Sequence, residues 1–303
     1  MKMLVLGDFQ GKFPFKLKRK IEKIKDEIDF IVGLGDYAGI DEWKPYIMKY
    51  IKIMKVSGRQ ESFEDFVGRK KYNSLMKKDF ELSKKVYKIL DSFGKPIHYI
   101  FGNSDDEWYN YPFGGKIWKI KKSKVNLIKK LNNFKSLNYR KRKIKGINFV
   151  GFGGYMDIEA YFDKKEWKGE TGEQIQNRKN RHKKAEKKLF DILKKTKKGT
   201  KGNENPLIFV LHYPPYGVFD IIKAGKNNPM NKKSAGVKFF TSAIKKYKPL
   251  LVFCGHMHEY KGMKKFHNTL VINPGEGGKG KAAVVEINID KNKRGKIKNM
   301  KFL

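Results

Sequence analysis

Five short apolar runs limit the folds open to this chain of 303 residues more than any other feature of its sequence. Each run is bounded by turn residues or by charged residues. Such runs are typical of strands buried in the core of an α/β domain. The predicted strands are residues 3–7, 30–35, 96–102, 206–211 and 249–255.

Segments with helical periodicity lie before several of these strands. Residues 15–28 bring Leu17, Ile21 and Ile24 to one face of a predicted helix. The same periodicity recurs in residues 75–94 and 237–248. Because strands and helices alternate, the sequence favours an α/β fold with a largely parallel or mixed sheet that helices cover.

The composition is that of a globular protein. Hydrophobic residues make up 39% of the chain and aromatic residues 14%. No apolar stretch approaches the roughly 18 residues of a membrane span, and the N-terminus lacks the long apolar run of a secretory signal. The single cysteine, Cys254, cannot form an intramolecular disulfide. We therefore expect a cytoplasmic protein that has no membrane partner.

The formal net charge of +38 makes a polyanionic partner such as nucleic acid plausible. The alternative is that lysine is simply spread over a solvated surface. Two stretches, within residues 116–146 and 177–205, are especially rich in lysine. No break in composition marks a second domain. We predict a single domain over residues 1–303, with insertions at about 37–95, 116–146 and 177–205.

Every predicted strand is followed by a residue of a type that binds metals. These residues are Asp8 and Gln10, Asp36, Asn103, His212, and His256 and His258. In open α/β sheets, ligands bind outside the carboxyl ends of the strands. Residues at positions i and i+2 of an extended segment point the same way, so each such pair can converge on one point. Taken alone, each residue has a structural explanation, such as a helix cap for Asp36 or a turn for Asn103.

The mixture of carboxylate, amide and imidazole suits borderline and hard divalent metals. It does not suit a structural zinc site built from thiolates. The number of donors exceeds what one tetrahedral ion needs, so a pair of ions that shares Asp36 fits best. We expect two divalent ions, with Mn as the first candidate and Fe, Ni, Co or Zn as alternatives.

In their order along the chain, these residues resemble the motifs of the calcineurin-like metallophosphoesterase superfamily. That family's pattern is D-x-H, GD, GNH-[DE], H and GH-x-H. It is matched here by GDFQ (7–10), GD (35–36), GNSD (102–105), LH (211–212) and GHMH (255–258). Residues 150–157, 211–217, 248–259 and 271–278 resemble the branch called Icc-related predicted phosphoesterases.

The resemblance implies a four-layer αββα sandwich of the α/β (α+β) class with two metal ions at the strand ends. Carried over by position, one ion is bound by Asp8, Gln10, Asp36 and His258. The other is bound by Asp36, Asn103, His212 and His256. The implied reaction is hydrolysis of a phosphate ester by a metal-activated hydroxide. The residues expected to act in catalysis are Asp36, Asn103, Ser104 and Asp105.

Two residues depart from the family pattern. Gln10 replaces the histidine of D-x-H, and its amide is a poorer donor that should hold the first ion more weakly. Ser104 replaces the histidine that assists the leaving group in the family. A hydroxyl is too weak an acid for that role. The loss of this histidine implies substrates with good leaving groups, another acid such as Asp105, or reduced activity. His98 is a further candidate for the acid, but we expect it to lie in the core.

Two other functions compete with a phosphoesterase. The first is a nuclease or a catalytically weak nucleic-acid-binding protein on the same fold, with aromatic residues such as Trp118, Phe134 and Tyr139 stacking on bases. We favour core packing for these aromatic residues. The second is a degenerate, metal-free structural protein, which the retained ligand-type residues argue against. The sequence does not indicate an oligomeric state.

Overall fold

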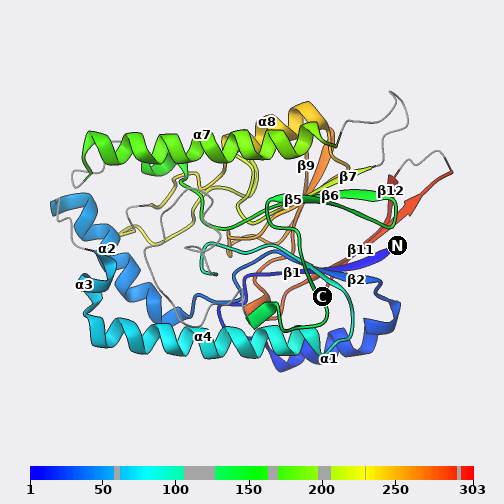
Figure 1. Ribbon diagram of the computed structural model, residues 1–303, viewed down its shortest axis with the longest axis horizontal. Helices are drawn as coiled ribbons and strands as arrows, with labels where there is room; N and C mark the ends of the chain where they lie inside the picture. Colours follow the sequence, from blue (N-terminus) through cyan, green and yellow to red (C-terminus); the bar gives the residue numbers. More distant parts are fainter. Residues whose placement is uncertain (58–61, 106–126, 163–169, 197–205, 229, 292–294) are drawn as a thin grey trace.

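In the part of the chain that the structure describes, twelve strands form two mixed sheets of six strands each (Figure 1). The computed structural model describes residues 1–57, 62–105, 127–162, 170–196, 206–228, 230–291 and 295–303. The first sheet consists of β1 (Lys2–Leu6), β2 (Phe30–Gly33), β3 (Ile97–Tyr99), β4 (Phe134–Ser136), β11 (Ala283–Ile289) and β12 (Gly295–Phe302). The second consists of β5 (Arg140–Ile144), β6 (Ile147–Phe152), β7 (Leu207–Leu211), β8 (Leu251–Phe253), β9 (Gly262–Phe266) and β10 (Thr269–Asn273).

The inner strands of both sheets are parallel, and antiparallel strands lie toward the edges. The first sheet has the order β12-β11-β1-β2-β3-β4, and β1 to β4 run parallel. The second has the order β5-β6-β7-β8-β10-β9, in which β6, β7, β8 and β10 run parallel. The five strands predicted from the sequence are β1, β2, β3, β7 and β8, all of them parallel.

The core between the sheets follows from the two-residue period of the strands. In β1, Met3 and Val5 are buried against residues of the second sheet such as Phe149, while Leu4 and Leu6 belong to the opposite, helix-covered face. Both faces of these strands are therefore buried, which explains why the sequence reads as continuous apolar runs.

Helices cover the outer face of each sheet and complete four layers (Figure 1). The first sheet is covered by α1 (Phe15–Ile24) and α4 (Arg69–Asp91), and the second by α7 (Gly172–Lys194) and α8 (Lys238–Tyr247). Two further helices, α2 (Lys44–Ser57) and α3 (Phe63–Val67), lie at one end of the sandwich. Short 3₁₀ turns occur at Lys25–Glu27, Asp41–Trp43, Glu159–Tyr161 and Gly277–Lys279. The predicted αββα sandwich is confirmed.

Local sequence explains where these helices begin and end. Thr171 and Gln174 form a reciprocal capping box at the start of α7. The predicted helix over 15–28 ends earlier, at Ile24, and continues as a 3₁₀ turn. The predicted helix over 75–94 is longer and begins at Arg69. Differences of this size at helix ends are ordinary, because the last turns have few fixed hydrogen bonds.

The lysine-rich stretches contribute edge strands and surface helices of the sandwich. The described part of residues 116–146 forms β4 and β5, and the helical part of 177–205 belongs to α7. Lysine also occupies most of the exposed positions of β9 and β12. Charged edges hinder pairing with another chain, which accounts for part of the excess positive charge. Residues 197–205 of the last predicted insertion lie outside the described residues, and the single-domain organisation stays a prediction.

No helix in the described ranges is both long enough and apolar enough to cross a membrane.

His98 lies in the core, as the sequence favoured. It is 7% exposed, and its ring meets the Phe30 ring edge-on with the centroids 5.3 Å apart. Burial, together with the charges of Lys135 and Arg142, lowers the pKa of His98 to about 4.

We expect His98 to make the protein less stable in acid. The unfolded chain gains a proton at this residue near pH 6.5, but the folded protein does so only near pH 4. The free energy of unfolding should therefore decrease as the pH falls between these values, by at most about 3 kcal/mol. Urea denaturation at pH 7.5 and pH 5 should show this decrease shrinking in His98→Leu but not in the turn variant His267→Asn. An equal decrease in His98→Leu and wild type would contradict the prediction.

Candidate metal centre

Seven polar side chains from five strand ends meet at the carboxyl ends of the parallel strands. In the first sheet, Asp8 and Gln10 follow β1, Asp36 follows β2 and Asn103 follows β3. In the second sheet, His212 follows β7, and His256 and His258 follow β8. The parallel topology explains this convergence, because the carboxyl ends of all five strands lie at the same end of the sandwich.

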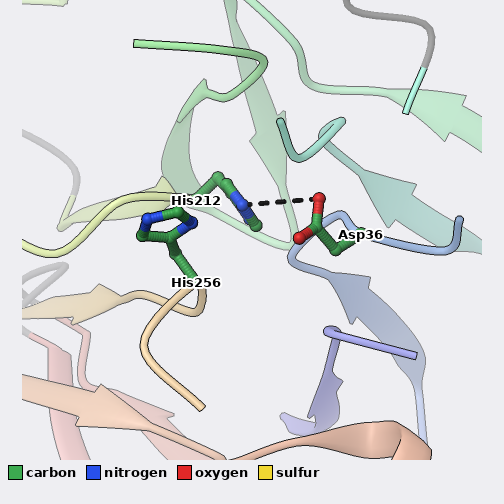
Figure 2. Close-up of side chains that lie close together, drawn as sticks. All are labelled: Asp36, His212 and His256. Atoms are coloured by element: carbon green, nitrogen blue, oxygen red, sulfur yellow. Dashed lines mark ion pairs between the residues drawn. The ribbon is translucent and has the colours of Figure 1, made fainter. Parts of the chain in front are cut away.

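Four of these residues form a histidine-rich group, which we call cluster A: Asp36, Asn103, His212 and His256. The ligand atoms of Asp36, His212 and His256 all lie within 4.8 Å of one another. Figure 2 shows these three side chains pointing toward one another from three separate loops. His212 Nε2 lies 3.5 Å from Asp36 Oδ1. Asn103 Oδ1 lies 2.9 Å from His212 Nε2 and 2.8 Å from His256 Nδ1.

The hydrogen bonds around His212 fit a cation in cluster A. His212 Nδ1 lies 2.8 Å from the backbone carbonyl oxygen of Leu34, which can only accept a hydrogen bond. In the neutral ring, Nδ1 therefore carries the proton and Nε2 presents a lone pair. That lone pair faces the oxygens of Asn103 and Asp36, which are acceptors as well. Several lone pairs that converge without a proton between them suit a divalent metal ion.

The second group, cluster B, consists of Asp8, Gln10, Asp36 and His258. The ligand atoms of Asp8, Asp36 and His258 lie within 4.8 Å of one another. His258 Nε2 is 3.7 Å from Asp8 Oδ1, and Gln10 Nε2 donates to Asp36 Oδ2 at 3.3 Å. Asp36 belongs to both clusters, so its carboxylate lies where it can bridge two ions.

Burial and neighbouring charges shift the pKa values of these side chains in different directions. Burial raises the pKa of Asp36; the charge of His212 opposes this rise, and that of Asp8 adds to it. Burial also lowers the pKa of His256, and the neighbouring histidines lower it further. Burial opposes protonation of His258 as well, but the hydrogen bond and charge of Asp8, with the charges of Asp36 and Glu276, together outweigh burial and raise the pKa to about 9. His256 is therefore a neutral imidazole at physiological pH, the form that binds metals.

Comparison with known proteins identifies the family. A family model described as "Metallophosphoesterase, calcineurin superfamily" matches residues 1–297. The chain belongs to this superfamily. Among curated proteins, the uncharacterized protein MJ1162 of Methanocaldococcus jannaschii is 30% identical over 152 residues. That match spans 49% of this chain and only 57% of the relative.

A solved structure with a TM-score above 0.5 supports the fold. One crystal structure covers 100% of this chain and 98% of its own, with a TM-score of 0.62 and 17% sequence identity. The crystal structure of TT1561 of Thermus thermophilus covers 98% of both chains, with a TM-score of 0.49 and 17% identity. The superfamily membership and the fold inferred from the motifs are thus confirmed.

The loops of the metallophosphoesterase site adopt sparsely populated backbone conformations. Asp8, Gln10, Asp36 and His256 all have positive φ angles, between 51° and 67°. Residues other than glycine rarely adopt such angles, which persist where surrounding contacts enforce them. Neighbouring glycines make room for this arrangement: a Cβ atom on Gly102 would lie 2.1 Å from Asp36 Oδ1.

Asp105 holds the loop that carries Asp36. Its Oδ2 accepts hydrogen bonds from the backbone N–H groups of Asp36 at 2.8 Å and Gly102 at 2.7 Å. Its Oδ1 accepts from the N–H groups of Tyr37 at 3.0 Å and Ala38 at 3.2 Å. The side chain is 2% exposed. These contacts suit a positioning role better than the role of acid suggested by the sequence.

Asp79 extends this set of contacts between a carboxylate and backbone N–H groups, and it was not identified from the sequence. It lies in α4, is buried, and its Oδ1 accepts from the N–H groups of Gly39 at 2.7 Å and Ile40 at 3.0 Å. Five consecutive backbone N–H groups, 36 to 40, are thus held by two carboxylates. A signal was present in the sequence, because Asp79 interrupts the apolar stripe between Leu75 and Val86.

Two further contacts at the centre could not be assigned from the sequence. The Tyr213 ring lies on the His256 ring, with the centroids 3.9 Å apart. The turn formed by residues 273–278, of sequence NPGEGG, packs on the loop of Asp8. There the N–H group of Gly278 donates to the Asp8 carbonyl oxygen at 3.1 Å. Both contacts fix backbone or ring orientation beside candidate ligands.

The two departures from the family motifs lie side by side. A Cβ atom on Gly39 would lie 2.5 Å from Ser104 Oγ and 3.3 Å from Gln10 Oε1. The Ser104 N–H group donates to Asp36 Oδ1 at 2.8 Å, and Asn103 Nδ2 donates to Ser104 Oγ at 3.3 Å. This side of the centre, toward cluster B, therefore has no imidazole at either position.

We expect Gln10→His to bind the cluster B ion more tightly, by about tenfold. In the wild type, the Gln10 amide group donates to Asp36 and must turn over before its oxygen can face an ion. Calorimetric titration with Mn²⁺ should give one tight and one weak event in the wild type, and two closer affinities in the variant. Gln176→His, the same change on the exposed surface of α7, should leave both affinities unchanged. Two equal affinities in the wild type would refute the prediction.

Proposed function

We propose that this chain is a metal-dependent phosphoesterase that hydrolyses a phosphodiester or a phosphomonoester. The observation that carries the proposal is the pair of buried donor clusters that share Asp36. The superfamily to which the chain belongs supports the same conclusion. Carboxylate, amide and imidazole donors with no thiolate are suited to the divalent ions that hydrolytic enzymes use.

In this proposal, each cluster holds one divalent ion. Cluster A provides Asp36, Asn103, His212 and His256, and cluster B provides Asp8, Gln10, Asp36 and His258. Mn²⁺ is the first candidate, because cluster B contains two carboxylates and an amide, which favour a harder ion. Fe, Ni, Co and Zn are alternatives.

The protein's own contribution is to fix the donors. When bound, the ions would lower the pKa of water and neutralise charge on the phosphoryl oxygens. The Leu34 carbonyl oxygen orients His212, and the Tyr213 ring orients His256. Asp105 fixes the loop of Asp36, while Ser104 contributes its backbone N–H group to the Asp36 carboxylate. Such preorganised donors cost little rearrangement during a reaction.

Metal content and hydrolysis, measured on the same samples, test the proposal. Plasma mass spectrometry should find about two ions per wild-type chain after Mn²⁺ reconstitution. Bis(4-nitrophenyl) phosphate and 4-nitrophenyl phosphate then rank diester against monoester hydrolysis. The double variant His256→Ala/His258→Ala should lose metal and turnover, and His267→Asn, outside the clusters, should keep both. A wild-type chain that binds no Mn²⁺ would rule out the proposal.

The described residues do not favour the nucleic-acid alternative. Phe134 packs edge-on against Tyr99, with ring centroids 5.5 Å apart, and Tyr139 packs edge-on against Phe152 at 4.9 Å. The Tyr139 hydroxyl also donates to the Gly153 carbonyl oxygen. These rings pack within the fold and do not offer a stacking surface, while Trp118 lies outside the described residues. Only the net positive charge still favours a nucleic-acid partner, and charge alone does not indicate which polyanion binds.

A further inference from the structure

The positions of the histidines limit how a leaving group can be protonated. The chain has six histidines, and all lie in the described part of the chain. Three belong to the metal clusters, and His98 packs on Phe30. His182 Nδ1 lies 3.0 Å from the Asp157 carbonyl oxygen, with its ring against Phe239, and His267 packs on Phe266 in a turn. No imidazole of the chain is therefore left beside the metal clusters to act as a general acid.

Asp105, the nearest alternative acid in the sequence, has both oxygens engaged. Each oxygen accepts hydrogen bonds from two backbone N–H groups, which are donors only. The carboxylate also lies behind the loop of Asp36 and is 2% exposed. Asp105 is thus unsuited to deliver a proton to a substrate.

Ser104 cannot act as the general acid either. Its hydroxyl oxygen accepts a hydrogen bond from Asn103 Nδ2 and packs against Gly39. An aliphatic hydroxyl is a very weak acid, whereas efficient proton transfer requires a pKa near the working pH. Neither a free histidine, nor Asp105, nor Ser104 is therefore placed to protonate an alkoxide as it leaves.

We infer that the substrates of this chain are phosphoanhydrides, such as nucleoside diphosphates or pyrophosphate-linked compounds, and not alkyl phosphate esters. The inference rests on the metal centre of the proposed function and changes the bond that is broken from an ester to an anhydride. In this reaction, the oxygen of water forms a bond to one phosphorus and the bond from that phosphorus to the bridging oxygen breaks. The electron pair stays on the bridging oxygen, and the proton from water goes to the solvent. A phosphate leaving group has a pKa of about 6, far below that of an alcohol, and departs without a proton.

The charge near cluster B is compatible with a substrate that carries more than one phosphate. Lys12 lies two residues after Gln10, and Lys279 directly follows Gly278, which contacts the loop of Asp8. Both lysine side chains are largely exposed, at 59% and 67%. Their carboxylate partners are Asp41 and Glu276. A second phosphate would thus approach a region where positive side chains are accessible.

Three thymidine compounds that differ only in the leaving group test the inference. They are thymidine 5′-diphosphate, the 4-nitrophenyl ester of thymidine 5′-phosphate, and the methyl ester of the same phosphate. With the Mn²⁺-loaded wild type, kcat/KM for the diphosphate and the nitrophenyl ester should exceed that for the methyl ester by about 10²–10⁴-fold, the usual contribution of a general acid. Comparable kcat/KM values for the methyl ester and the diphosphate would overturn the inference.

A variant at position 104 gives a second measurement. Ser104→His should raise the ratio of kcat/KM for the methyl ester to kcat/KM for the diphosphate at least about tenfold. Ser104→Ala should keep the wild-type ratio between the two compounds; a collapse of this ratio would show that the hydroxyl does serve as an acid, and would overturn the inference. If Ser104→His does not fold, the wild-type series decides alone. Failure to hydrolyse any of the three compounds, together with both nitrophenyl phosphates, would instead refute the proposed function.

Discussion

Asp36→Asn is expected to reduce phosphoesterase activity by at least about 10³-fold and to remove most of the bound metal. Asp36 is the only residue common to both clusters of the described structure. An amide in its place keeps the size of the side chain but loses the negative charge that would balance two divalent ions. Because metal ions supply several kcal/mol of charge stabilisation in such reactions, losing them should cost at least three orders of magnitude in rate.

Asp41→Asn is a matched control for this substitution. Asp41 lies five residues further along the chain and pairs with Lys12 and Lys44 on the surface. Its exposed ion pairs contribute little to stability, so the control should keep its metal and nearly all of its activity. Metal content, Mn²⁺ titration and hydrolysis of bis(4-nitrophenyl) phosphate should be measured on both variants. An Asp36→Asn protein that retains two ions and more than a tenth of its activity would remove Asp36 from the centre of the mechanism.

The parallel strands and their polar ends could be predicted because burial on both faces leaves a plain pattern. An apolar run followed by a polar residue is visible without knowledge of neighbours, as for Phe30–Gly33 and Asp36. The parallel arrangement then brings such residues together. The order of the motifs indicated the family, and the fold of that family predicted the second sheet.

Four of the remaining strands, β4, β5, β9 and β12, could not be predicted, because they lie at sheet edges and lack a continuous apolar run. The interior strands β6, β10 and β11 are mostly buried and were missed. In β12, lysines alternate largely with partly buried residues, and in β5 four of the five residues are basic; both patterns are typical of exposed segments. Pairing with β6 and β11 decides their structure, and such long-range pairing leaves little local signal. The same limitation applies to Tyr213, whose contact with His256 depends on two different strands.

The supports of the site were harder to find than its ligands. Metal ligands are recognised by chemical type, but a carboxylate that holds backbone N–H groups looks like any other acidic residue. Asp79 and Asp105 come from different parts of the chain and hold neighbouring halves of one loop. The strained backbone of Asp36, with a φ angle of 52°, depends on such contacts. We therefore expect the positions of the ligands to respond to residues that bind neither metal nor substrate.

Asp105→Asn tests this expectation. The Asn side chain has one acceptor oxygen and one donor group, so two of the four backbone N–H groups would face another donor. Leaving such buried groups unpaired should lower the free energy of unfolding by about 2–4 kcal/mol. As the loop of Asp36 relaxes, Mn²⁺ affinity should fall by about 10–100-fold, the usual effect of losing a group that orients a metal ligand.

Denaturant unfolding of the metal-free protein and calorimetric Mn²⁺ titration measure the two effects separately. The control is Asp191→Asn, which changes an acidic residue on the surface of α7 and should shift stability by less than about 0.5 kcal/mol. A general acid would behave differently from a positioning residue, because its loss slows the reaction without loosening the fold or the metal. An Asp105→Asn protein of wild-type stability and wild-type metal affinity, but with reduced activity, would therefore assign Asp105 to proton transfer. It would also reopen alkyl phosphate esters as substrates.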